Sequence, residues 1–507
     1  MHRLFSRPGH IAAALALALA VLSMLCSCGG KENRLDAEIR KIAENPELQS
    51  VQGLDMLSSV ILENPDAYKA YIRPDGSIDL RRLGETVERT GKRTDPKFRW
   101  DITAYGGVPR GDLRLNLYLE RSGSMTGYDA RSTSGDFKRT LNELITRFPR
   151  VDGIPGSISV VNDAVYPYRG SFEEFVQQKD IFDATDGLGD PSYTDFARIF
   201  EYVLRDTVAE NINVLVTDLI YSPRDTRGVT PAKIFNEEQS LATSIFQKHA
   251  DKSVIVVKLE GDFDGLYYPY STPQSGRRYK GQRPYYAVIT GSAAAMYRLR
   301  HDSRYANFVD FSSLPGYNAE YIFSREPLIL SYYSLLPRGK GMKGSYSLGA
   351  TQGETGSHAL KDIKGDADGI ASFRIAANLN GVPASPDYIL DTKNYTLTGA
   401  PGARILKIEP ITEGMIDART RRFLEPATHL FTVEVDTRHL SPDMEISLSN
   451  SLPQWIKASA CADDNNTSAR NFGTTTFGVD RLLEGIYRAY HGASASPRLF
   501  TLRLATQ

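Results

Sequence analysis

The 507-residue sequence carries almost no net charge and lacks the motifs of several common enzyme classes. Its 60 Lys and Arg are balanced by 61 Asp and Glu, which leaves a formal net charge of −1. Without an excess of either sign, composition gives no electrostatic reason to expect nucleic acid as a partner. The eight histidines show no zinc-ligand spacing, and no Walker A loop or Gly-x-Ser-x-Gly elbow is present. These absences argue against the corresponding zinc-dependent, nucleotide-binding and serine-nucleophile enzymes.

Long apolar runs are also scarce, and the strongest one lies at the N-terminus. Basic residues at Arg3 and Arg7 precede an apolar run over 11–25, which is shorter than the roughly 20 residues of a membrane-spanning helix. That length is typical of the apolar core of a secretory signal peptide. The run ends in Leu25-Cys26-Ser27-Cys28, which resembles the lipobox of bacterial lipoprotein signals.

The lipobox resemblance implies a mature protein that begins at Cys28 and is held by acyl chains. Residues 1–27 are then a signal peptide, and Cys28 carries lipid such as palmitate. We therefore expect a membrane-anchored protein of the cell envelope, on the outer membrane, facing either the periplasm or the cell surface. An uncleaved membrane anchor is the alternative. Cys461 is the other cysteine of the mature chain, so no intramolecular disulfide is expected.

Residues 28–110 are predicted to form a lipid tether followed by a few helices. Apolar residues with helical spacing cover Arg34–Ala43 and Gly53–Glu63, and turn signals follow the second segment. No group of residues typical of a catalytic site occurs in this region.

Residues 111–300 alternate between strand-like and helix-like patterns, which predicts an α/β domain with a doubly wound, mostly parallel sheet. We expect strands over Leu113–Leu119, Ser157–Val165, Asn213–Leu219, Val254–Leu259 and Tyr286–Thr290. We expect helices over Asp136–Arg147, Phe196–Leu204, Glu237–His249 and Ala293–Arg300. The Tyr-, Gly- and Arg-rich segment Gly261–Gln282 is predicted to be an exposed insertion.

The remainder of the chain has weaker helical periodicity. Residues 301–370 are rich in Gly and Ser and predict a linker or extended insertion. Over 371–507, short strands separated by turns predict a β-sandwich of immunoglobulin-like kind. The expected strands are Ser372–Ala377, Tyr388–Asp391, Ile405–Ile411, Leu430–Val435, Met444–Leu448 and Phe500–Leu504. One helix, Val479–Tyr490, is expected to interrupt the sandwich.

The most informative stretch follows the first strand of the α/β domain. Leucine occupies every second position of Leu113–Leu119, as in a strand with one face against a core. Glu120, Ser122 and Ser124 follow on the adjoining loop. A carboxylate and two hydroxyls at alternate positions after a buried strand can converge on one hard cation.

This stretch resembles the first metal-binding loop of the von Willebrand factor type A family, Asp-x-Ser-x-Ser, with Glu120 in place of the Asp. The resemblance covers residues 111–300 and implies a Rossmann-like fold. In that family Ser122 and Ser124 correspond to serines that coordinate the cation directly. Thr194, just before a helix, corresponds to a third direct ligand, and Asp218, at the end of a strand, to the acid that holds the ion through water. All five positions follow strands or precede a helix, where such folds place their sites.

The same resemblance implies a binding function in which the five residues hold Mg²⁺, or Mn²⁺ or Ca²⁺. An open coordination position would take a carboxylate from a protein ligand, as in adhesion or in scaffolding of an envelope assembly. No catalytic residues are predicted, which favours a binding module over an enzyme. The extra methylene of Glu120 moves its carboxylate by about 1.5 Å, a large step for an ion that demands octahedral geometry. The ion could shift, a water could be expelled, or the site could be empty.

Two other interpretations stay open on the sequence alone. One is a metal-dependent hydrolase that uses Glu120 or the acidic loop with Asp183, Asp186 and Asp190. The other is a structural lipoprotein in which the Ser-Gly-Ser loop is only a turn and Thr194 only caps a helix.

Overall fold

The computed structural model describes residues 33–74, 76–150, 156–221, 228–349, 356–492 and 497–506. The chain divides into two compact units, one of residues up to 101 without 50–52 and one of residues from 102 onward with 50–52. The predicted signal peptide and Cys28 lie outside the described residues and remain predictions. Within the described segments, no helix combines the length and apolarity needed to cross a membrane.

The first unit is helical, as the spacing of its apolar residues predicts. It contains α2 (Arg34–Glu44), α3 (Val51–Glu63) and α4 (Leu80–Thr94). Side-chain caps set two of the starts, because Asn33 accepts from the Leu35 N–H and Asp79 from the Arg82 N–H. The apolar faces of α2 and α4 contact each other and bury residues such as Leu35 and Leu83.

The second unit contains a seven-stranded sheet in the order β3-β2-β1-β4-β6-β5-β7. Its strands are β1 (Arg114–Glu120), β2 (Ser157–Val161), β3 (Val165–Pro167), β4 (Asn211–Thr217), β5 (Lys252–Tyr267), β6 (Arg277–Ser292) and β7 (Tyr317–Phe323). Only the pairs β2–β1 and β1–β4 are parallel, and the other neighbouring pairs are antiparallel. The α/β class is therefore confirmed, but the sheet is mixed and not mostly parallel. The reason is the direct β5–β6 hairpin, which allows only antiparallel pairing.

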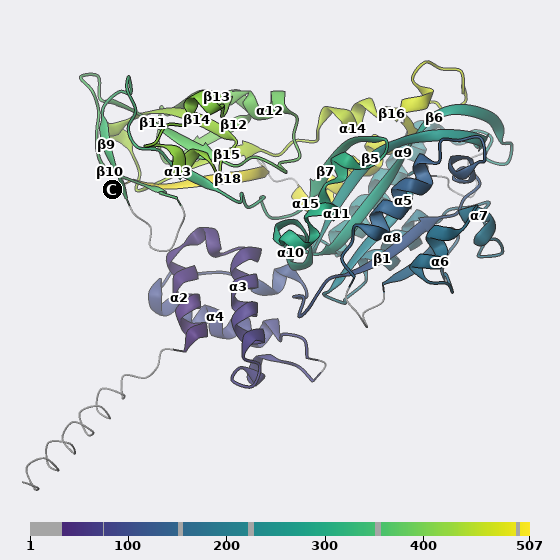
Figure 1. Ribbon diagram of the computed structural model, residues 1–507, viewed down its shortest axis with the longest axis horizontal. Helices are drawn as coiled ribbons and strands as arrows, with labels where there is room; N and C mark the ends of the chain where they lie inside the picture. The colour runs from purple at the N-terminus through teal and green to yellow at the C-terminus, as the bar shows by residue number, and fades with distance from the viewer. Residues whose placement is uncertain are drawn as a thin grey trace, which may run out of the picture. The chain divides into compact units, whose positions relative to one another are not determined.

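The segment Gly261–Gln282 extends β5 and β6 into one long hairpin, in which residues such as Arg278 and Gln282 are exposed as expected. The two strands pair without a break from Lys252 opposite Ser292 to Tyr267 opposite Arg277. The outer half of the hairpin packs against residues near the end of the chain, where Phe472 and the Tyr267 ring meet at 4.8 Å. Figure 1 shows this hairpin beside the yellow segment that carries β16 (Ala460–Cys461). Packing against such a distant segment has no local sequence signal.

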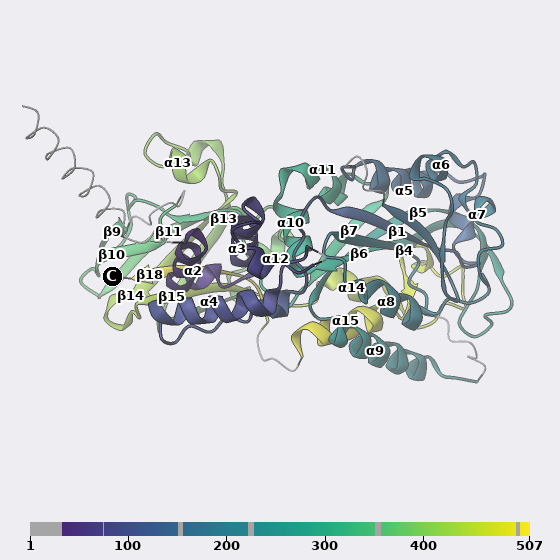
Figure 2. The same ribbon diagram turned by 90° about the horizontal axis from the view of Figure 1, so that it is seen from below.

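Helices cover both faces of the sheet (Figure 2). One face carries α5 (Asp136–Thr146), α6 (Phe172–Gln177), α10 (Ala293–His301) and α11 (Ala306–Val309). The other carries α8 (Phe196–Leu204), α9 (Pro231–Lys248) and α15 (Val479–His491). The apolar residues of each set share a core with the strands, which makes three layers.

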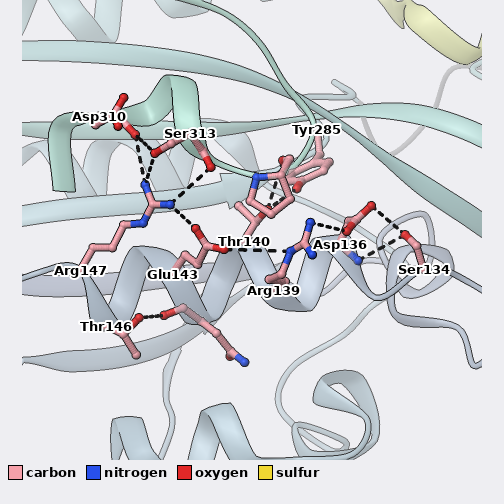
Figure 3. A network of polar contacts seen from close by, with 12 residues as sticks. Ser134, Asp136, Arg139, Thr140, Glu143, Thr146, Arg147, Tyr285, Asp310 and Ser313 are labelled. Carbon is pink, nitrogen blue, oxygen red and sulfur yellow. Dashed lines mark hydrogen bonds and ion pairs between the residues drawn. The ribbon is translucent and has the colours of Figure 1, made fainter. Parts of the chain in front are cut away.

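The described residues of the segment expected as a linker, 301–370, instead contribute strands to the seven-stranded sheet and to two further sheets. Their first part forms α11 and the edge strand β7, and Arg147 of α5 donates to the Asp310 carbonyl and the Ser313 hydroxyl at 3.1 and 2.7 Å. Figure 3 shows this network together with Tyr285, which donates to Thr140 at 3.1 Å. The Gly and Ser content of the segment reflects tight turns between short elements, not a free linker.

The strands that follow β7 form two further sheets around one shared core. One has the order β12-β15-β18-β10-β9 and the other β13-β14-β11-β8. The first sheet contains β12 (Tyr395–Thr398), β15 (Asp443–Ser449), β18 (Arg498–Thr506), β10 (Ala359–Lys364) and β9 (Ser345–Gly349). The second contains β13 (Arg404–Pro410), β14 (His429–Asp436), β11 (Ile370–Ala377) and β8 (Tyr333–Leu335). Inward residues such as Phe373 and Leu502 form the shared core, so the sandwich architecture is present.

Two details of this sandwich differ from expectation. The predicted strand Tyr388–Asp391 is the helix α12 (Pro386–Leu390), because Ser385 caps it by accepting from the Tyr388 N–H and Pro386 begins it. The predicted helix over Val479–Tyr490 exists as α15, but it packs against α9 of the α/β domain. The chain therefore leaves the α/β domain after β7, returns to it for α14 (Gln454–Ala458) and α15, and ends in the sandwich with β18.

Candidate metal centre

Glu120 ends the strand β1, and it lies at the edge of the sheet where the parallel strands have their carboxyl ends. Alternate leucines of this strand, such as Leu117 and Leu119, are fully buried in the core under α5. Glu120 is the last residue of the strand and its side chain points into the protein, with 1% of the residue exposed. A carboxylate buried to this degree needs partners.

Two threonines supply those partners. Thr194 donates its hydroxyl to Glu120 Oε1 at 2.7 Å, and Thr217, the last residue of β4, donates to Oε2. Both oxygens of the carboxylate are thus hydrogen-bonded. Thr217 is absent from the residues predicted from sequence, although it immediately precedes Asp218.

The remaining three predicted residues form a second chain of hydrogen bonds beside the first. Ser122 and Ser124 lie with their hydroxyl oxygens 3.0 Å apart. Ser124 donates to Asp218 Oδ2 at 2.6 Å, and Asp218 Oδ1 accepts from the Ile220 N–H at 3.0 Å. The structure therefore brings all five predicted residues together in one site of oxygen donors.

The pKa values of both carboxylates of this site are raised. Burial raises the pKa of Glu120, the charge of Asp218 raises it further, and the hydroxyls of Thr217, Thr194 and Ser122 oppose the shift. Burial likewise raises the pKa of Asp218, against the bond from Ser124. A site that disfavours its own negative charge is a site that a cation would stabilise.

Arg283 on β6 is a fixed positive charge near this pair. Its guanidinium is buried, lies 4.7 Å from the Tyr267 ring centre and 4.3 Å from that of Phe472, and donates to the Thr475 carbonyl at 2.9 Å. Its charge lowers the pKa of Asp218 and so offsets part of the burial effect. One positive charge against two carboxylates leaves the site short of cationic charge.

The loop that carries Thr194 has a separate residue for capping. Asp195 is the N-cap of α8 and accepts from the Arg198 N–H at 3.0 Å. The hydroxyl of Thr194 is consequently free of the capping role and serves Glu120. The same loop is tied to the first one, because the Gly123 N–H donates to the Pro191 carbonyl at 3.0 Å.

The third loop holds strained backbone directly after Asp218. Leu219 is fully buried and has a φ of 53°, a left-handed conformation that costs a bulky residue free energy. Its N–H donates to the Thr217 hydroxyl at 2.9 Å. Strain of this kind persists where the surroundings enforce it and concentrates at functional sites.

The hairpin tip covers part of the site. A Cβ on Gly123 would lie 2.9 Å from the Tyr268 ring, so glycine permits this close approach. Ser122 is 7% exposed and Thr194 5%, whereas Ser124 is half-buried. Ser124 is therefore the most accessible of the five side chains.

The acidic loop proposed as an alternative does not assemble into a site. Asp186 pairs with Arg121 at 2.8 Å, and Asp190 accepts from the Ser192 hydroxyl at 2.6 Å. Among the residues that the structure describes, no group of three or more His, Cys, Asp and Glu side chains is placed to hold a metal. The five-residue site has two carboxylates and three hydroxyls, so its donors are all oxygen, which suits Mg²⁺ or Ca²⁺ more than softer metals.

Comparison of the chain with protein-family models, with curated proteins and with solved structures gave no match in any of the three. The assignment of the site consequently depends on its own geometry.

Sequence reasoning missed three residues of the site: Thr217, Tyr268 and Arg283. Thr217 had a detectable signal, since its hydroxyl occupies the strand end next to a predicted ligand. The other two come from the hairpin and reach the site only through the fold.

Proposed function

We propose that the protein is a lipid-anchored component of the cell envelope whose α/β domain binds a protein partner through a divalent cation. Glu120, Ser122, Ser124, Thr194 and Asp218 would hold the cation, with Mg²⁺ as the first choice and Mn²⁺ or Ca²⁺ as alternatives. The observation that supports this most is the convergence of these five oxygen-bearing side chains from three separate loops. The type A fold and the immunoglobulin-like fold belong to the same proposal.

The chemistry of the site is consistent with binding of a cation. Two carboxylates with raised pKa values leave room for added positive charge, and three hydroxyls can offer lone pairs once they rotate. A bound cation would supply residual positive charge to a carboxylate of the partner. Ser124, the most accessible member, would lie nearest to that partner. A protein binding in this way suits adhesion or the scaffolding of an envelope assembly.

The test is calorimetric titration of Mg²⁺ and Mn²⁺ into the chain from Gly29 onward, beside the variant Ser122→Ala/Ser124→Ala. We expect saturable one-to-one binding that the variant loses by at least about ten-fold, because two of five ligands are removed. Ser345→Ala/Ser347→Ala is the matched control, since it removes two exposed serines of the same spacing from β9. Equal binding by all three proteins would place the cation elsewhere.

A second candidate function is supported by the hydrogen bonds themselves. The hydroxyls already satisfy both carboxylates, as in a purely structural network of a lipoprotein whose site takes no cation. Absence of binding in the titration would select this alternative.

The lipid anchor is tested separately. Metabolic labelling with palmitate should mark the wild-type protein and not the variant Cys28→Ala. Equal labelling of both would contradict the anchor without bearing on the metal site.

A further inference from the structure

Arginines gather on the outer face of the four-stranded sheet of the sandwich, away from the candidate metal centre. Along β11, Phe373 and Ile375 face the core, so Arg374 between them projects from the opposite face. The Leu336 N–H donates to the Arg374 carbonyl at 2.9 Å, which places the continuation of β8 directly beside it. The helix α13 (Arg421–Leu424) packs over the same face through Phe423 and Ala376 and is visible next to β11 and β13 in Figure 2.

The guanidinium of Arg374 lies against the protein with one of its donors unsatisfied. Its Nε is buried and makes no hydrogen bond. Within the described part of the chain the whole side chain has no ion pair or hydrogen bond, although residues such as Arg404 nearby are paired. Gly339 allows this placement, because a Cβ there would lie 2.8 Å from Arg374 Nη2. A buried guanidinium donor left unsatisfied is costly, and an anion would satisfy it.

The charges of two further arginines, Arg338 and Arg419, act on the same tyrosine as the charge of Arg374 does. Tyr346 of β9 donates to the Leu336 carbonyl at 2.9 Å, beside Arg374. Burial raises the pKa of this tyrosine to about 12, and the charges of Arg374, Arg338 and Arg419 act against that rise. The charges of three guanidinium groups thus act on one phenol.

The acids nearby do not neutralise this cluster. Glu434 already forms ion pairs with Lys343 at 2.9 Å and with Arg404 at 2.7 Å. Asp417 directs Oδ1 to the Thr420 N–H and hydroxyl and to the Arg419 N–H, at 2.8 to 2.9 Å. Neither acid forms an ion pair with Arg374 among the described residues. The charge of Arg374 does help to lower the pKa of Asp417, but one carboxylate against three guanidinium groups leaves positive charge in excess.

The geometry points to a binding site for a phosphate group at Arg374, with Arg338 and Arg419 as the flanking cations. Planar guanidinium groups bind tetrahedral oxyanions through paired N–H donors, and several of them suit a multiply charged phosphate better than a single carboxylate does. Arg338 contributes rigidity, because it donates to the carbonyls of Met342 and Gly344 at 2.8 Å each and so holds the turn beside the site. The phosphate could belong to a soluble molecule or to the head group of an anionic lipid.

The experiment uses the chain from Gly29 onward, which contains every described residue and no acyl anchor. Pyrophosphate is titrated into the protein by calorimetry, and sedimentation is measured with phosphatidylcholine vesicles with and without phosphatidylglycerol. We expect saturable binding of pyrophosphate that Arg374→Gln weakens by about ten-fold or more, as for loss of charge-assisted hydrogen bonds. Arg419→Gln should weaken it less, by about three-fold, because this residue is exposed.

The control is Arg421→Gln, which removes an exposed arginine of α13 that is already paired with Glu425 at 2.9 Å. It should bind as the wild type does. Sedimentation with phosphatidylglycerol that pyrophosphate competes away and Arg374→Gln abolishes would assign the phosphate to a lipid. Pyrophosphate binding without sedimentation would assign it to a soluble molecule. Absence of both, or equal binding by wild type and Arg374→Gln with matched thermal unfolding, would overturn the proposal.

Discussion

Replacing Glu120 by Gln separates the two roles that this buried carboxylate can have, as a structural acceptor and as a cation ligand. The amide has nearly the same shape and still offers one oxygen. Thr194 and Thr217 each carry a hydroxyl that can donate or accept, so both contacts of Glu120 can persist after the change. What disappears is the negative charge beside Asp218.

The expected change in stability without cation is small. Hydrogen bonds to a charged acceptor contribute about 1.5–3 kcal/mol and those to a neutral one about 0.5–1.5 kcal/mol, so two weakened bonds cost about 2 kcal/mol. The substitution also removes the cost of burying a charge at Glu120 next to the acid Asp218, and this gain in stability is of comparable size. The free energy of unfolding of Glu120→Gln in EDTA should therefore lie within about 1 kcal/mol of the wild-type value.

With cation present the two proteins should diverge. A ligand at one hundred times its Kd stabilises the folded state by about 2.7 kcal/mol, which corresponds to roughly 5–10 °C in Tm for a domain of this size. Thermal unfolding in EDTA and along a Mg²⁺ titration should show this rise for the wild type and little of it for Glu120→Gln. Glu425→Gln, at an exposed acid on the sandwich, is the control and should follow the wild type.

Two results would refute this reasoning. An equal rise in Tm for wild type and Glu120→Gln would mean that the cation binds away from Glu120. A variant that is several kcal/mol less stable in EDTA would mean that the carboxylate is a structural acceptor whose charge the site requires.

Two further substitutions test buried charges elsewhere in the α/β domain. Glu238 on α9 is buried with neither oxygen hydrogen-bonded, and burial, helped by Asp480, raises its pKa well above the usual value. Because the folded state retains the proton, wild-type stability is highest below the unfolded pKa and falls as pH rises, by at most about 1.4 kcal/mol per pH unit. Denaturant unfolding at pH 5 and pH 8 should show that Glu238→Gln lacks this fall, and parallel pH profiles would contradict it. Arg283→Lys should cost about 2–4 kcal/mol, since an ammonium cannot fill the planar space between two rings. Limited proteolysis should then cut the β5–β6 hairpin faster than in wild type, and an unchanged cleavage rate would contradict the role assigned to Arg283.

The candidate site was largely predictable because its signals are local. A strand of alternate leucines ends at Glu120, and the hydroxyls follow within four residues. Asp218 closes a second strand, and parallel neighbours carry their ends to one edge of the sheet. The nine expected helices and strands of this domain were predicted from the same period-2 and helical patterns, and the structure forms an element close to each, although the strand expected over Ser157–Val165 ends at Val161.

The rest of the fold depends on contacts between distant segments. Within Gly261–Gln282, the outer parts of β5 and β6 pack against Phe472, which lies about 200 residues further along the chain. The antiparallel half of the sheet follows from that hairpin. The Gly and Tyr content of the segment gives no local signal that it forms long strands. The helix α15 carries its own clear periodicity, but the sequence does not say that its apolar face meets α9.

The two crossings of the chain between domains have a consequence for biosynthesis. The α/β domain lacks α15 until residue 491 has been made, and the sandwich lacks β18 until residues 498–506 have been made. Since β18 is the middle strand of its sheet, every shorter product leaves β15 and β10 with open edges, which invite aggregation. The core of the α/β domain is therefore complete only once α15 has been made, and that of the sandwich only once β18 has been made, so a stop codon ahead of α15 should damage both domains.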